Sequence, residues 1–100
     1  MLELEFNNSV LTVHLSGELD HHSAAVIRKK IDSKTEQLKP KTLQLDYSNV
    51  QFMDSSGIGL IMGRYRQMSL LGGNVEVTNV PNHLKRMFSL SGIETLGVMK

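Results

Sequence analysis

The sequence has 100 residues, none of which is cysteine, and a formal net charge of +1 at pH 7. A chain of this length forms one domain, here residues 1–100, and buries enough surface for a single core. The missing cysteines exclude disulfides, thiol catalysis and cysteine-ligated zinc, and the small net charge argues against a dedicated nucleic-acid-binding protein.

Alternating apolar and polar residues predict an opening β-hairpin. Residues 2–7 alternate, residues 10–15 alternate again, and a turn sequence of Asn7, Asn8 and Ser9 lies between them. His14 falls on the outer side of the second strand, where we expect a partly exposed structural role.

Residues 16–23 break the strand pattern, and a helix and a further strand follow. Apolar residues recur at helical spacing over residues 24–38, and either Asp20 or Ser23 is the expected N-cap of this helix. Residues 42–46 predict a short strand, and residues 47–53 predict a loop that leads to a second helix. The apolar stripe of that second helix consists of Ile58, Ile61, Met62, Tyr65 and Met68.

Leu60 and Leu71 lie off this stripe, so we expect them at the surface, either against a partner or as isolated surface leucines. Residues 74–78 predict another strand, residues 81–91 a short helix, and residues 93–100 a final short strand. The order β-β-α-β-α-β-α predicts an α/β fold, with a mixed sheet of four to five strands and helices packed mainly on one face.

The stretch of residues 51–59 joins a strand to the second helix and concentrates polar residues and glycines. It contains Asp54, Ser55, Ser56, Gly57 and Gly59. Aspartate and serine are common at helix N-termini because they accept hydrogen bonds from unpaired backbone N–H groups. One serine is enough to cap the helix, so the second is spare. Each glycine in the first turns destabilises a helix by about 1 kcal/mol relative to alanine, which suggests that something approaches the backbone closely.

Other chemistry fits these residues poorly. The stretch lacks the Gly-x-Ser-x-Gly turn of a serine hydrolase and the Gly-Lys-Ser/Thr ending of a phosphate-binding loop. His21 and His22 are neighbours whose imidazoles diverge, and no ligand spacing supports a metal site. No signal peptide or long apolar run is present. We therefore expect a cytoplasmic protein that is not an enzyme, with no cofactor, no metal and no membrane contact.

A serine at a helix N-terminus can instead accept a phosphoryl group. The unpaired N–H groups and the positive end of the helix dipole tolerate a phosphate there. Its charge of about −2 would act on whatever docks at that surface. Because Glu18, Asp20 and Asp54 already make this neighbourhood acidic, phosphorylation is expected to prevent docking without unfolding the domain.

Three segments of the sequence resemble the STAS family of anti-sigma-factor antagonists. These are residues 17–22 (Gly-Glu-Leu-Asp-His-His), residues 52–59 (Phe-Met-Asp-Ser-Ser-Gly-Ile-Gly) and residues 63–65 (Gly-Arg-Tyr). Residues 85–88, followed by Ser91 and Gly92, extend the resemblance over nearly the whole chain.

The resemblance implies regulation by partner switching, controlling sporulation-type transcription. The unphosphorylated protein would bind an anti-sigma factor that is also a serine kinase with bound ATP or ADP, and so release the sigma factor. Phosphorylation of Ser55 would end this binding, and a serine phosphatase would restore it. The resemblance assigns Asp20 to contact or positioning of the kinase and Ser56 to capping. It places Asp54, Ser56, Gly57 and Gly59 with Asp20 in the partner-binding surface.

Three alternatives remain open. The chain could antagonise an anti-sigma factor of the general stress response, carry a phosphoryl group on His21 or His22, or bind nucleotides as a sensory module. The family usually has a further strand and a last helix after the segment matching Ser91 and Gly92, whereas this sequence stops at Lys100. We expect this shorter end to leave the sheet edge less covered, and a homodimer is then a further alternative.

Overall fold

The computed structural model describes residues 2–100 and begins with the predicted hairpin. Strand β1 (Leu2–Asn7) pairs antiparallel with β2 (Val10–Leu19). The two residues between the strands, Asn8 and Ser9, both have positive φ angles, of 51° and 65°. A two-residue hairpin turn requires this backbone, because its twist matches that of the strands.

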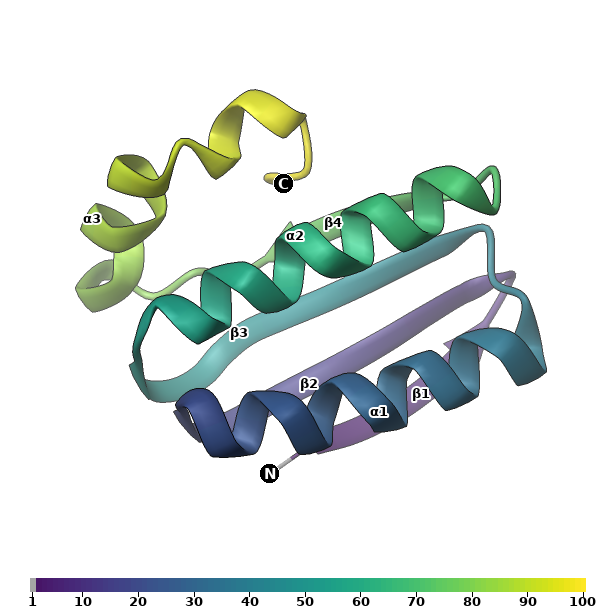
Figure 1. Cartoon of the computed structure of the whole chain (residues 1–100), viewed down its shortest axis with the longest axis horizontal. Coiled ribbons are helices and arrows are strands. Elements are labelled where there is room, and N and C mark those ends of the chain that lie inside the picture. The colour runs from purple at the N-terminus through teal and green to yellow at the C-terminus, as the bar shows by residue number, and fades with distance from the viewer. Residues whose placement is uncertain (1) are drawn as a thin grey trace.

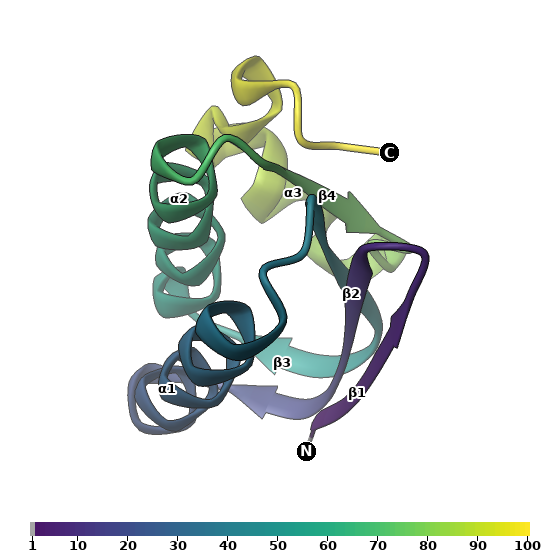
Figure 2. The same ribbon diagram turned by 90° about the vertical axis from the view of Figure 1, so that its right-hand side faces the viewer.

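The remaining elements follow in the predicted order and build a four-stranded sheet (Figure 1). They are α1 (His21–Leu38), β3 (Thr42–Met53), α2 (Ser55–Leu70), β4 (Asn74–Thr78) and α3 (Asn82–Ser91). The strand order is β1-β2-β3-β4, with β2, β3 and β4 parallel to one another. Helices α1 and α2 cover one face of the sheet, and α3 lies at the end near the start of α2 (Figures 1 and 2). The predicted α/β fold with a mixed sheet is confirmed.

Two strands are longer than the sequence pattern indicated. β2 continues to Leu19 rather than stopping at Leu15, and β3 continues to Met53 through the segment predicted as a loop. In β3 the alternation fails because extra residues stand opposite β2, between Asp46 and Asn49 and between Val50 and Phe52. The bulges in β3 place its later residues out of phase, so a period-of-two pattern cannot detect the second half of that strand. In β2 the buried Leu19 stays in phase with Leu15, but the three residues between them, Ser16, Gly17 and Glu18, are not apolar.

The apolar face of α2 also differs from the predicted stripe. Leu60 is buried, whereas Met62 retains 47% of its surface. The helix packs against both the sheet and α1, so its buried face is wider than one stripe and is rotated toward α1. Leu71, just after the helix, is exposed as expected.

The uncovered face of the sheet carries a polar network around His14. Its Nδ1 lies 2.6 Å from Asp46 Oδ2, and its Nε2 contacts Glu5. Asn79 Nδ2 donates to the other Asp46 oxygen at 3.1 Å. The hydrogen bonds to Glu5 and Asp46 raise the pKa of His14, and the pKa of Asp46 falls to about 2 because hydrogen bonds from Ser48 and His14 outweigh its burial. The predicted structural role of His14 is confirmed.

Residues 93–100 do not form the predicted regular strand. A short 3-10 helix spans Ile93–Leu96, and the chain then makes a single parallel bridge between Met99 and Val77 of β4. The Val77 N–H donates to Val98 O at 2.7 Å, and the Lys100 N–H donates to Val77 O at 2.9 Å. This segment therefore covers the outer edge of β4.

Tyr47 connects the sheet to the start of α2 and to α3. Its side chain is fully buried, and its hydroxyl donates to the carbonyl of Gly57 at 3.2 Å. Its ring meets that of Phe88 edge to face, with 5.4 Å between centroids. A single buried residue thus fixes the first turn of α2 and the position of α3 beside it.

Candidate functional site

The two long helices begin side by side because β2 and β3 end together. Leu19 is the register partner of Met53, and an aspartate follows each of them. The Asp54 N–H continues the pairing by donating to Leu19 O at 3.3 Å. The carboxyl ends of parallel strands meet at one edge of the sheet, so Asp20 and Asp54 lie at that edge although 34 positions separate them in the sequence (54 − 20).

Asp20 caps α1 as part of a capping box, in which Asp20 and Ser23 exchange hydrogen bonds. Its Oδ1 accepts from the Ser23 N–H at 2.9 Å, and the Asp20 N–H donates to Ser23 Oγ at 2.9 Å. The Ser23 hydroxyl in turn donates to Glu18 O at 2.9 Å. Hydrogen bonds from Ser23 lower the pKa of the Asp20 carboxyl. Of the two predicted caps, Asp20 is the N-cap and Ser23 completes the capping box.

Asp54 caps α2 through a single side-chain hydrogen bond, without a capping box. Its Oδ1 accepts from the Ser56 N–H at 2.8 Å, and its backbone is extended, with φ of −98°. The prediction that Ser56 caps this helix is wrong, because the aspartate two residues earlier already accepts the bond. Ser55 is the first helical residue and is exposed, while Ser56 is half-buried. The accessible hydroxyl at this junction belongs to Ser55.

The two glycines in the first turns of α2 have different surroundings. Gly57 is buried, and a Cβ there would lie 2.2 Å from Met53 Cγ and 3.2 Å from Leu19 Cδ2. Gly59 is exposed, and a Cβ there would meet no atom within 4 Å. The close approach predicted at Gly57 is therefore made by the chain's own core. Gly59 is the glycine that leaves the surface of α2 open.

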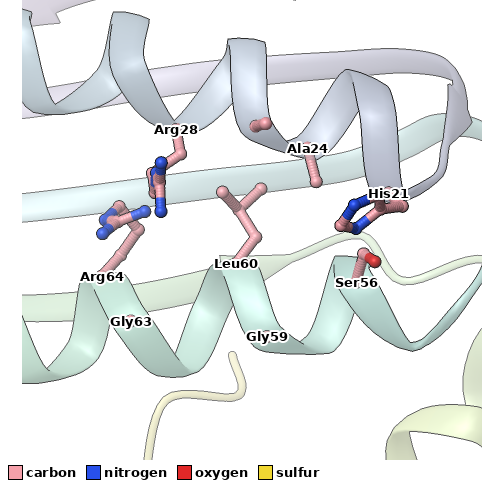
Figure 3. Close-up of a pocket in the computed structure, with 9 residues that line it drawn as sticks. His21, Ala24, Arg28, Ser56, Gly59, Leu60, Gly63 and Arg64 are labelled. Carbon is pink, nitrogen blue, oxygen red and sulfur yellow. The ribbon is translucent and has the colours of Figure 1, made fainter.

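Two grooves border this site. One lies between α2 and α3, has a volume of about 650 Å³, and includes Ser55, Gly59, Met62, Arg86 and Leu90 in its lining. The other lies between α1 and α2, has a volume of about 280 Å³, and reaches from His21 and Ser56 to Arg28 and Arg64 (Figure 3). Ser55 faces the first groove and Ser56 faces the second.

The STAS domain family matches residues 1–97 of this chain. The chain therefore belongs to the STAS domain family, as the sequence resemblance indicated. Within residues 2–100, no helix is both long and apolar enough to span a membrane.

Among relatives, the anti-sigma F factor antagonist of Paenibacillus polymyxa is 39% identical over 92 residues, which cover 92% of this chain and 79% of the relative. The anti-sigma-B factor antagonist of Bacillus subtilis is 28% identical over 95 residues, covering 95% and 85%. Among solved structures, the anti-sigma factor antagonist SpoIIAA in its unphosphorylated form superposes with a TM-score of 0.87 at 32% identity. That match covers 100% of this chain and 86% of SpoIIAA. SpoIIAA in its phosphorylated form gives a TM-score of 0.79 at the same identity, covering 100% and 89%.

Sequence reasoning missed Tyr47 and the basic residues of α3 that border the site. Tyr47 lies in a segment predicted as a loop, so no periodicity marked it as a core residue. Arg86 was noted only as part of the resemblance, although its three-residue spacing from His83 places both in the α2–α3 groove. A helical projection of α3 shows that spacing.

Proposed function

We propose that this chain is an anti-sigma factor antagonist of the SpoIIAA type that acts by partner switching in the cytoplasm. In its unphosphorylated form it binds an anti-sigma factor, which then releases a sigma factor for sporulation-type transcription. That anti-sigma factor is also a serine kinase and uses ATP to phosphorylate Ser55. The phosphorylated chain no longer binds, and a serine phosphatase restores binding.

The observation that carries this proposal is the exposed hydroxyl of Ser55 at the first position of α2, beside two helix-capping aspartates. Similarity to two proteins named anti-sigma F factor antagonist, at 39% and 35% identity, supports the partner class. The first of these is more similar than the anti-sigma-B antagonists, whose identities are 28% and below, which favours the sporulation type.

The cap geometry supports a phosphate that stays at the surface. Asp54 already accepts the Ser56 N–H through its carboxylate and the Gly57 N–H through its carbonyl, at 2.8 and 3.0 Å. Two donors of the first turn are therefore engaged, and the carboxylate repels a neighbouring phosphate. A phosphoryl group on Ser55 would point into the solvent and meet a docking partner directly.

The docking surface that we propose centres on Asp20, Asp54, Ser56 and Gly59. It continues into the α2–α3 groove, where Met62 and Leu90 retain 47% and 76% of their surfaces. Exposed apolar side chains beside a polar rim are typical of a protein interface. Gly57 shapes the proposed docking surface indirectly, because its missing side chain lets the first turn of α2 pack against Met53 and Leu19.

The test is to map phosphorylation sites by mass spectrometry after incubation with ATP and the candidate anti-sigma kinase. The native chain, Ser55→Ala and Ser56→Ala are compared. We expect one acid-stable phosphate that is lost only in Ser55→Ala. An acid-labile phosphate on His21 or His22 would instead identify a phosphocarrier. No phosphate on any form would overturn the proposed switch.

A further inference from the structure

Two arginines, Arg28 and Arg64, give the groove between α1 and α2 a positively charged lining. His21, Arg28 and Arg64 line it with Ser56, Leu60 and four small residues, namely Ala24, Ala25, Gly59 and Gly63. No carboxylate lines this groove among the described residues 2–100. Figure 3 shows the guanidinium groups of Arg28 and Arg64 close to one another on the facing helices.

Arg64 is buried without full hydrogen bonding. It is 7% exposed, and its Nε lies 3.0 Å from Asp32 Oδ1, close enough for an ion pair but not oriented for a hydrogen bond. Its Nη1 is sealed from solvent and has no hydrogen-bond partner within residues 2–100. Guanidinium carries five N–H donors, and donors left unsatisfied inside a protein are destabilising. This side chain therefore has unused capacity to bind an anion.

The charge balance around Arg64 is also incomplete. Burial lowers the pKa of Arg64, the charge of Asp32 opposes that shift, and the positive charge of Arg28 adds to it. Asp32 is one carboxylate beside two guanidinium groups, so one positive charge is left over. A bound anion would neutralise that charge and accept hydrogen bonds from the guanidinium N–H groups that line the groove.

We propose that the α1–α2 groove binds a small oxyanion of the phosphate class, held by Arg28 and Arg64 with His21 at its end. Two guanidinium groups on facing helices donate from two directions, which suits a tetrahedral anion with several oxygens better than a planar carboxylate. Gly59 and Gly63 provide room, because a Cβ at either position would meet no atom within 4 Å. Ser55 does not line this groove, although Ser56 and Gly59 of the proposed docking surface do.

The test is an amide NMR titration of the full chain with inorganic phosphate, using sodium chloride at matched ionic strength and pH as the reference. We expect the amide signals of Gly59 and Gly63 to shift saturably with phosphate and not with chloride. The Ser55→Ala variant should bind phosphate equally well, so this result is separate from the outcome of the phosphorylation experiment. Equal shifts in chloride would overturn the proposal.

Variants identify the residues that hold the ion. Arg28 is exposed, so Arg28→Gln should fold normally and weaken phosphate binding by about tenfold or more, as expected for a lost charge-assisted hydrogen bond. Arg66→Gln is the matched control, because Arg66 is exposed on α2 but does not line the groove. Gly63→Ala tests whether the groove needs the space at this position, since the added methyl group keeps the helix and narrows the groove. Equal binding by Arg28→Gln and Arg66→Gln would contradict the assignment.

Two further ligands define the chemical class. Adenosine monophosphate carries its phosphate as a monoester. If it shifts the same amide signals and binds more tightly than inorganic phosphate, the ligand of the groove is a substituted phosphate. Binding of inorganic phosphate alone would identify the free ion. Both results support the site. Acetate binding as tightly as phosphate would overturn the assigned class.

Discussion

Helices α1 and α2 begin one residue after an aspartate at the same edge of the sheet, yet their first turns differ. At α1 the capping box is closed, because Ser23 accepts from the Asp20 N–H and donates to Glu18 O. At α2 the corresponding third position is Gly57, which has no side chain to return the bond. At α2 the hydroxyls instead stand at the first two positions, and that of Ser55 is the exposed one. Ser23 stabilises the start of its helix, whereas Ser55 is exposed at the start of α2.

The largest effect on stability is expected from giving the third position of α2 a side chain. In Gly57→Ala the new Cβ would overlap Met53, so we expect a net loss of about 1–3 kcal/mol in the free energy of unfolding. Gly59→Ala is the control. Its site is open, so it should gain up to about 1 kcal/mol from helix propensity. Urea denaturation measures both, and equal stabilities would contradict the packing of Gly57.

Charge at Ser55 should act on the partner rather than on the fold. Ser55→Asp is expected to lower affinity for the anti-sigma factor by about tenfold or more, because it places a second carboxylate beside Asp54 in the proposed docking surface. Ser55→Asn has nearly the same shape without the charge and serves as the control. Calorimetric titration of each variant measures the difference. Equal affinities for the two variants would remove the electrostatic explanation.

Removing the cap of α2 should cost about 1 kcal/mol. Asp54→Ala leaves the Ser56 N–H without its partner, whereas Asp54→Asn keeps an acceptor and removes the charge. We expect thermal unfolding to show the loss in the alanine variant and near-native stability in the asparagine variant. A loss of the same size in both would mean that charge, rather than hydrogen bonding, holds the turn.

The two serines provide a direct comparison. Ser23→Ala removes the hydroxyl that accepts from the Asp20 N–H and donates to Glu18 O, and it should cost about 1 kcal/mol. Ser55→Ala changes an exposed side chain and should stay within about 0.5 kcal/mol of the native chain. Chemical denaturation of the pair tests this. A large loss in Ser55→Ala would show that its hydroxyl has a structural role.

Acid should weaken the start of α1 in a way that depends on Asp20. Its pKa is lowered in the folded chain by hydrogen bonds from Ser23, so the stabilisation is present above the unfolded pKa of 3.8 and is lost as the pH falls through the folded value. Asp20→Asn should flatten this part of the stability curve. Unfolding measured at steps between pH 5 and pH 2 tests it, and an unchanged slope would contradict the assignment.

The order of elements, the hairpin and the α/β fold could be predicted because periodicity and turn residues are local signals. The aspartates and serines were found by their helix-start chemistry. The second half of β3 could not be found, because bulges after Asp46 and after Val50 disrupt its alternation. The end of β2 could not be found because residues 16–18 are Ser, Gly and Glu, which show no apolar pattern. Asp54 was not separated from Ser56 as the cap, since both residue types cap helices and only backbone geometry distinguishes them. The pairing of Arg64 with Asp32 depends on how α1 packs against α2, which no local pattern encodes.

The parallel pairing of β2 with β3 has a consequence for how the chain folds. A parallel pair must wait for its crossover helix and for closure of a long loop, so it forms later than a hairpin such as β1–β2. Asp20 and Asp54 come together only when Leu19 and Met53 have paired, at the far end of that register. A nascent or partly folded chain therefore lacks the sheet edge at which α1 and α2 begin side by side. A kinase or partner that recognises this edge acts only on chains in which β2 and β3 have paired along their full length.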